Sequence, residues 1–98
     1  MKPLDRIKTG YFYFDPEDPI YRDHFPGSPV VPGSLIIHAF MEAVGDPIGT
    51  ETFRRATRFR FKQFIPPGKY AFRIQSRQDG RTDCRLFDQD KTVVTGVL

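Results

Sequence analysis

The chain has 98 residues, which is enough for one domain and too few to cover a second hydrophobic core. Hydrophobic residues make up 39% of the chain, and a charged fraction of 28% without a long block of one sign argues against disorder. The net charge of +3 favours an acidic partner only weakly, because an ordinary solvated surface explains so small a value.

The cysteine count and the hydropathy bear on the compartment. Cys84 is the single cysteine, so no internal disulfide forms and nothing calls for an oxidising compartment. The first residues include Pro3 and several charges, without the apolar run of a signal peptide, and no stretch approaches the roughly 20 apolar residues of a membrane span. We therefore expect a cytoplasmic protein that does not enter a membrane.

The first half of the chain predicts a strand, a stiff loop and a helix. The aromatic residues 11–14 are typical of a strand, which the prolines after it stop. Residues 15–33 hold five prolines and two glycines, so they predict an irregular but stiff loop. Residues 34–44 contain neither Pro nor Gly, and Gly45 is a typical helix stop.

The predicted helix, residues 34–44, is apolar around almost its whole circumference, which is typical of a buried helix. The exceptions are Ser34, His38 and Glu42. Because these three are four residues apart, they form one polar stripe.

The second half predicts antiparallel strands. Residues 58–62 alternate between basic residues and Phe, which predicts a strand with Phe59 and Phe61 inward and three cations outward. Residues 70–74 alternate again, and residues 92–95 are typical of a last strand. Turn signals occur at residues 66–68, 79–80 and 88–90. One buried helix and four or five strands predict an α+β fold in which a curved sheet wraps around the helix.

Residues 23–38 carry the candidate chemistry. Three prolines within residues 26–32 stiffen a loop that leads into the predicted helix, whose first backbone N–H groups lack intrahelical partners and lie at the positive end of the helix dipole. Gly33 leaves its N–H unshielded, so a carbonyl oxygen can approach it closely. His24, held nearby by the loop, is suited to take a proton from the carbon next to that carbonyl. A base and an oxyanion donor together can form an enolate-like species.

Two stretches combine several residue types at fixed spacing. The first stretch is His24-Phe25-Pro26-Gly27 with Pro29, Pro32, Gly33 and the apolar residues 35–37. The second is the alternating residues 58–62 with the turn at residues 66–68. Both resemble the hot-dog 3-hydroxyacyl-[acyl carrier protein] dehydratases of fatty acid synthesis. The resemblance implies a single hot-dog domain over residues 1–98, an antiparallel β-sheet wrapped around one central buried helix. It also implies a homodimer or dimer-based oligomer, because the family's site is built from two subunits.

The same resemblance implies a role for each residue of the site. His24 is the general base, the Gly33 N–H polarises the thioester carbonyl, and the third catalytic position is His38. The substrate-binding positions are Phe25, Pro26, Gly27, Val31, Pro32, Ile37 and Glu42, with Phe25, Val31 and Ile37 as walls of an acyl tunnel beside the helix. The expected reaction is dehydration of a 3-hydroxyacyl thioester to a trans-2-enoyl thioester, without a metal or other cofactor. The acyl group is carried by an acyl carrier protein or by coenzyme A.

His38 departs from the family, which has Glu or Asp there, contributed across the dimer interface to help protonate the leaving hydroxyl. Three interpretations stay open. In the first, His38 or a water it holds replaces the acid. In the second, the site hydrolyses a thioester, with His38 or Glu42 activating water, and in the third the protein is a non-catalytic binder or an assembly subunit. An imidazolium donates a proton readily. Burial and the helix N-terminus disfavour its charge, whereas Glu42 one turn on favours it. A purely structural role, in which His38 fills a partly polar slot, fits equally well.

The remaining polar residues have simpler interpretations. Ser34 is expected to cap the helix and Cys84 to pack in the core. The two His have no metal-ligand spacing with other residues. The densest basic cluster is Arg54, Arg55, Arg58, Arg60 and Lys62. It suits an acidic carrier protein or simply a solvated strand face, and a nucleic-acid partner is not expected because the alternation directs the Phe rings to the core.

Overall fold

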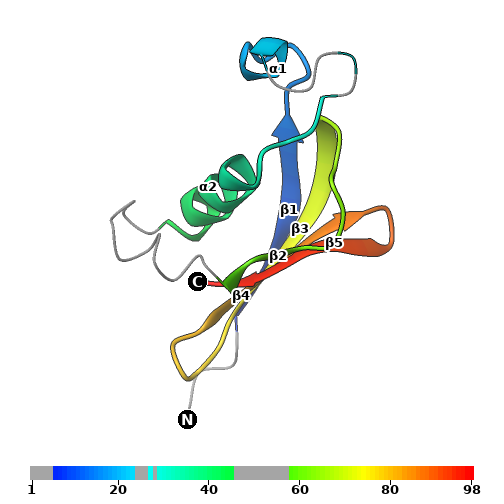
Figure 1. Cartoon of the computed structure of the whole chain (residues 1–98). Helices are drawn as coiled ribbons and strands as arrows, with labels where there is room; N and C mark the ends of the chain where they lie inside the picture. Colours follow the sequence, from blue (N-terminus) through cyan, green and yellow to red (C-terminus); the bar gives the residue numbers. More distant parts are fainter. Residues whose placement is uncertain (1–5, 24–26, 28, 46–57) are drawn as a thin grey trace.

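The computed structural model describes residues 6–23, 27, 29–45 and 58–98. Its helices and strands are β1 (Arg6–Phe14), α1 (Ile20–Asp23), α2 (Gly33–Val44), β2 (Arg60–Phe61), β3 (Gly68–Ser76), β4 (Thr82–Asp88) and β5 (Lys91–Val97). The five strands form one antiparallel sheet in the order β1-β3-β4-β5-β2, with α2 on one side of it (Figure 1). This is the expected α+β hot-dog architecture. No helix within the described ranges is long and apolar enough to cross a membrane.

The sheet follows the alternation of the sequence. In β3 the residues Tyr70, Phe72 and Ile74 are buried on the side of α2, and in β4 the same holds for Cys84 and Leu86. Successive side chains of a strand point to opposite faces, so the residues between them lie on the outer face of the sheet. The prediction that Cys84 is a packing residue is confirmed, since it is 1% exposed.

Three aromatic rings join the helix to the sheet. Phe12 of β1 stacks on Phe72 of β3 with ring centroids 4.2 Å apart, and its ring meets Phe40 of α2 edge to face at 5.0 Å. Phe40 is fully buried. Such aromatic contacts add to the free energy gained by burying the rings, so this cluster holds α2 on the sheet.

The helix α2 begins at Gly33 and ends where the sequence predicts. Gly45 adopts a left-handed conformation with φ 82°, and its N–H donates to the carbonyls of Met41 and Glu42. This closes the last turn, as a glycine does readily after a helix. Ser34 is not the cap that we expected, because the N-cap residue is Pro32 and no side chain caps the helix.

The expectation of a helix buried all round is also wrong for the single chain. Ile36, Phe40 and Met41 are buried. The other apolar residues, Leu35, Ile37, Ala39, Ala43 and Val44, are only partly buried. One chain therefore covers only one stripe of α2 and leaves part of the apolar surface accessible.

The strand expected at residues 58–62 is reduced to the two residues of β2. Phe59 is buried, but Phe61 is 40% exposed, although the register places it on the side of α2 as predicted. The Phe59 ring lies directly over Gly96 of β5, where an added Cβ would come within 2.5 Å of the ring. The glycine thus provides the space into which this ring packs.

Candidate active site

The loop that leads into α2 is attached to the segment after β2. The Val31 N–H donates to the Ile65 carbonyl at 2.9 Å, and both side chains are buried. Pro32 follows with φ −61° and ψ 142°, an extended conformation that its ring favours. The chain therefore reaches Gly33 in a fixed direction, with the Val31 side chain buried in the core.

The start of α2 offers backbone donors. The Pro32 carbonyl accepts from the N–H groups of Leu35 and Ile36 at 3.0 and 3.3 Å, which leaves the N–H groups of Gly33 and Ser34 ahead of the first intrahelical bonds. The first turn contains no acidic residue. The positive end of a helix of 12 residues is thus available to an oxygen that carries partial negative charge.

Phe61 lies against this helix end, a contact that the sequence reasoning missed. A Cβ added to Gly33 would lie 2.9 Å from Cζ of the Phe61 ring. A side chain at position 33 would therefore displace the Phe61 ring as well as crowd any ligand that approaches the backbone N–H. The alternation in residues 58–62 was the available signal, since it directs Phe61 toward the helix.

His38 and Glu42 form a pair on the polar stripe of α2. The His38 Nδ1 lies 3.3 Å from the Glu42 Oε1, and the two side chains are 43% and 65% exposed. The expected contact between neighbouring turns is confirmed. The carboxylate lies on the Nδ1 side of the ring, so Nε2 is directed away from the pair.

The helix geometry separates His38 from Gly33 of the same chain. Five residues correspond to about 140° around the helix axis and about 7.5 Å along it. Ile37, four residues after Gly33, does share its face. The residues expected to act on one substrate are therefore on different faces of α2.

Part of the expected site lies outside the described residues. This applies to His24, Phe25 and Pro26. Gly27 is exposed and has φ 87°, a conformation that favours glycine. The base and the first wall residue expected from the sequence accordingly stay predictions.

An open groove of about 400 Å³ lies between β1 and α2. It is lined by Tyr11, Phe12, Tyr13, Phe14, Ala39, Glu42, Ala43 and Phe72. Among the described residues, Glu42 is the one expected substrate-binding position that lines this groove. The aromatic strand at residues 11–14 was a visible signal for it, but only the structure brings that strand beside the small side chains of the helix.

Two side chains that could otherwise act as nucleophiles, those of Cys84 and Tyr70, are buried. Desolvation raises the pKa of the Cys84 thiol to about 12, so the side chain is a thiol at neutral pH. Burial also raises the pKa of Tyr70, whose hydroxyl donates to the Pro66 carbonyl at 2.6 Å. Among the described residues, no three His, Cys, Asp or Glu side chains come together in a way that would hold a metal ion.

Known proteins resemble this chain over most of its length. The family model described as ApeI-like, ApeI dehydratase, matches residues 5–97. The 3-hydroxyacyl-[acyl-carrier-protein] dehydratase FabZ of Chlamydia trachomatis serovar L2 is 28% identical over 96 residues, covering 83% of this chain and 63% of that protein. The same enzyme of Aeromonas hydrophila is 36% identical over 77 residues, covering 68% of this chain and 48% of that protein. The chain thus corresponds to less than two thirds of these relatives.

The fold has a counterpart among solved structures. A chain of the dehydratase heterocomplex ApeI:P from Xenorhabdus doucetiae superposes with a TM-score of 0.65, covering 99% of this chain and 96% of that chain. The sequences are 21% identical, so this likeness concerns the fold alone.

Proposed function

The chain belongs to the ApeI-like dehydratase family, and from this premise we propose that it removes water from 3-hydroxyacyl thioesters to give trans-2-enoyl thioesters. The observation that carries the proposal is the start of α2, where the Gly33 N–H stands ahead of the first intrahelical hydrogen bonds. A thioester carbonyl oxygen bound there gains negative charge as the neighbouring carbon loses its proton. Backbone donors and the helix dipole stabilise that charge.

The proton transfers follow from the residue types. His24 takes the proton from C2, the electrons move into the C2–C3 bond, and the C3 hydroxyl leaves. His38 in its imidazolium form gives this hydroxyl a proton through Nε2, so that water departs rather than hydroxide. The Glu42 carboxylate lies against the Nδ1 side of the ring and orients Nε2 toward the hydroxyl. Solvent then returns both imidazoles to their starting states.

We propose that two copies of the chain complete the site. Because Gly33 and His38 lie on different faces of α2, the acid that serves one Gly33 comes from the helix of the second subunit. The partly buried apolar residues of α2 suit such an interface, since burying them would stabilise a dimer. The protein would act as a homodimer of single hot-dog domains, each extending over residues 1–98.

The proposed substrate is a thioester of an acyl carrier protein or of coenzyme A, and the proposed compartment is the cytoplasm. The curated relatives are named for action on the acyl carrier protein. The reaction as written moves protons only, so it requires no redox cofactor. Neither nucleic acid nor a membrane has a part in it.

A second candidate function rests on His38 itself. The family acid is absent at this position, and the imidazole is 43% exposed in the single chain. A protein that binds acyl thioesters without turning them over, or hydrolyses them with His38 or Glu42 activating water, is the alternative. It differs from the first proposal in the product formed, which is measurable.

The test is enoyl thioester formation by the parent, His24→Ala and His38→Glu. Activity in the parent that is lost in His24→Ala supports the dehydratase. An inert parent that becomes active as His38→Glu contradicts it, and favours binding or other chemistry at a site without its acid. Release of free thiol without enoyl product identifies a thioesterase.

Complementation between two inactive variants tests the two-subunit site. His24→Ala and His38→Ala, mixed, unfolded and refolded together, form mixed dimers in which one of two sites has both imidazoles. Random pairing restores roughly a quarter of the parent sites. Recovery of activity requires the two residues to come from different chains, whereas no recovery shows that both act within one chain.

A further inference from the structure

A row of three arginines crosses the outer face of the sheet. The strand registers join Thr9 to Arg73, Arg73 to Arg85, Arg85 to Thr95 and Thr95 to Arg60. Arg73, Arg85 and Arg60 therefore lie on one line that runs across the strands, and we call this set the arginine row. It is on the opposite side of the sheet from α2, and thus away from the proposed active site.

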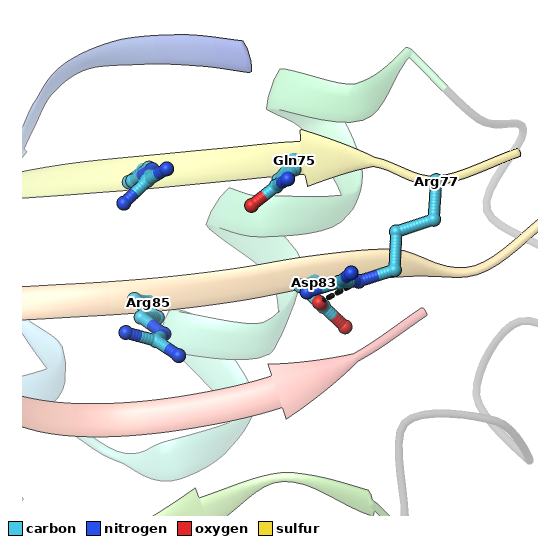
Figure 2. Close-up of a pocket in the computed structure, with 5 residues that line it drawn as sticks. Gln75, Arg77, Asp83 and Arg85 are labelled. Carbon is cyan, nitrogen blue, oxygen red and sulfur yellow. Dashed lines mark hydrogen bonds and ion pairs between the residues drawn. The ribbon is translucent and has the colours of Figure 1, made fainter. Parts of the chain in front are cut away.

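The arginine row has no counter-charge of its own. Arg60 and Arg85 are exposed and Arg73 is half-buried. Within the described residues none of the three side chains makes an ion pair or a hydrogen bond. The nearest acid of this face, Asp83, is engaged by Arg77 (Figure 2).

Two of these cations face each other directly. Arg73 and Arg85 are register partners in β3 and β4, and like charges opposite each other destabilise a sheet. Figure 2 shows the side chains around them standing on the outer face, with α2 behind the strands. A bound anion would remove the repulsion, so the arrangement favours occupation by negative charge.

The size and spacing of the surface indicate what kind of anion fits. Arg73 and Arg85 help to line a hollow of about 50 Å³ together with Gln75, Arg77 and Asp83. A hollow of this size holds a few waters or one carboxylate, and it is too small for a nucleobase.

The strand spacing matches a helix. Adjacent strands are about 4.8 Å apart, so Arg73 and Arg85 are one strand spacing apart. Arg60 lies two strand spacings beyond Arg85. One turn of an α-helix rises about 5.4 Å. A helix laid across the strands therefore presents carboxylates from successive turns to successive positions of the row.

From this match we propose that the arginine row is the docking surface for an acidic helix of a protein partner. Carboxylates one turn apart bind Arg73 and Arg85 through paired hydrogen bonds, and a third, two turns further, binds Arg60. This surface is independent of the proposed dehydratase activity, since none of its residues belongs to that site. The partner is defined by its chemistry, a helix with Glu or Asp repeated along one face.

The test uses a labelled synthetic helical peptide with Glu at positions i, i+4 and i+11 of one face, and a second peptide of the same composition with those Glu distributed around the helix. Binding to the whole chain is followed by fluorescence anisotropy in low salt. The parent is expected to bind the first peptide at least about tenfold more tightly than the second. The charge reversal Arg85→Glu, and separately the neutral Arg85→Gln, should each lower that affinity, by about tenfold or more for the reversal.

Lys91→Glu is the matched control, because it makes the same change in net charge at an exposed position outside the row. It should leave peptide affinity within about twofold of the parent. An equal loss in Lys91→Glu and Arg85→Glu, equal binding of the two peptides, or no binding at all overturns the proposal. Tighter binding of a single-stranded oligonucleotide than of the first peptide overturns it as well. Circular dichroism verifies that each variant is folded.

Discussion

The two sides of the twelve-residue helix α2 differ in burial and in what they contribute to stability. One stripe, with Ile36, Phe40 and Met41, is buried against the sheet and holds the fold together. The other, with His38 and Glu42, stays accessible and contributes little to stability, because a surface ion pair is worth only a fraction of a kcal/mol. A helix that serves a site must therefore separate the residues that stabilise it from the residues that react.

The largest effect should come from the buried stripe. Phe40→Ala removes the fully buried ring that meets Phe12 and Phe72, and it should lower the free energy of unfolding by about 3–5 kcal/mol. Denaturant unfolding followed by circular dichroism measures it. Phe64→Ala, which truncates a ring that is 82% exposed, is the control and should change stability by less than about 0.5 kcal/mol. Similar losses in both variants would show that α2 is not held by this cluster.

The accessible stripe should show the opposite behaviour. His38→Gln keeps a polar side chain of similar length but cannot donate a proton as an acid, so enoyl formation should fall by about a hundredfold or more. The free energy of unfolding should stay within about 0.5 kcal/mol of the parent. Steady-state rates and denaturant unfolding of the same preparation measure both. A large loss of stability with unchanged turnover would reverse the assignment of the two stripes.

The pH dependence of stability reports on the buried layer. Burial raises the pKa of Cys84 from 9.0 to about 12, so the folded state keeps its proton where the unfolded state has lost it. Stability is then complete below pH 9 and falls as the pH rises above it, by up to about 1.4 kcal/mol per pH unit. Unfolding of the parent and Cys84→Ala between pH 8 and 10.5 measures the slope. Equal slopes of unfolding free energy against pH in the two proteins would show that the thiol does not titrate in this range.

The smallest effect should come from Glu42→Gln. Its pairing with His38 is partly exposed, so the change in unfolding free energy should be about 0.5 kcal/mol or less. Turnover in steady-state assays, in contrast, should fall several-fold, because the His38 ring loses the carboxylate that orients it. An unchanged rate would show that Glu42 does not position His38.

The sequence predicted much of the fold because alternation and helix signals act locally. The inward residues Tyr70, Phe72 and Ile74 and the stop at Gly45 were each readable from neighbouring residues. The cap at Ser34 was misassigned because the N-cap lies two residues earlier, at Pro32, whose fixed conformation suits that position. Local chemistry therefore fixed the ends of α2, β3 and β5 within one or two residues, whereas β1 begins at Arg6, five residues before the aromatic run at residues 11–14.

The predictions that failed concern contacts between residues that are distant in the chain. The full burial expected of α2 assumed surfaces on all sides, whereas one sheet covers one stripe. The contact of Phe61 with Gly33 and the groove between β1 and α2 arise only once the strands are placed side by side. Motifs indicate candidate residues for the site, but not which chain would supply each of them.

The contact between Phe59 and Gly96 has a consequence for how this fold varies. β2 pairs with β5 through two residues only, so the ring packed over the glycine does much to keep that edge in place. Any side chain at position 96 must collide with the ring unless the ring becomes smaller. The two positions are therefore expected to change together: a library that randomises both should recover Gly96 wherever an aromatic residue remains at position 59, and a larger residue at 96 only with a small one at 59.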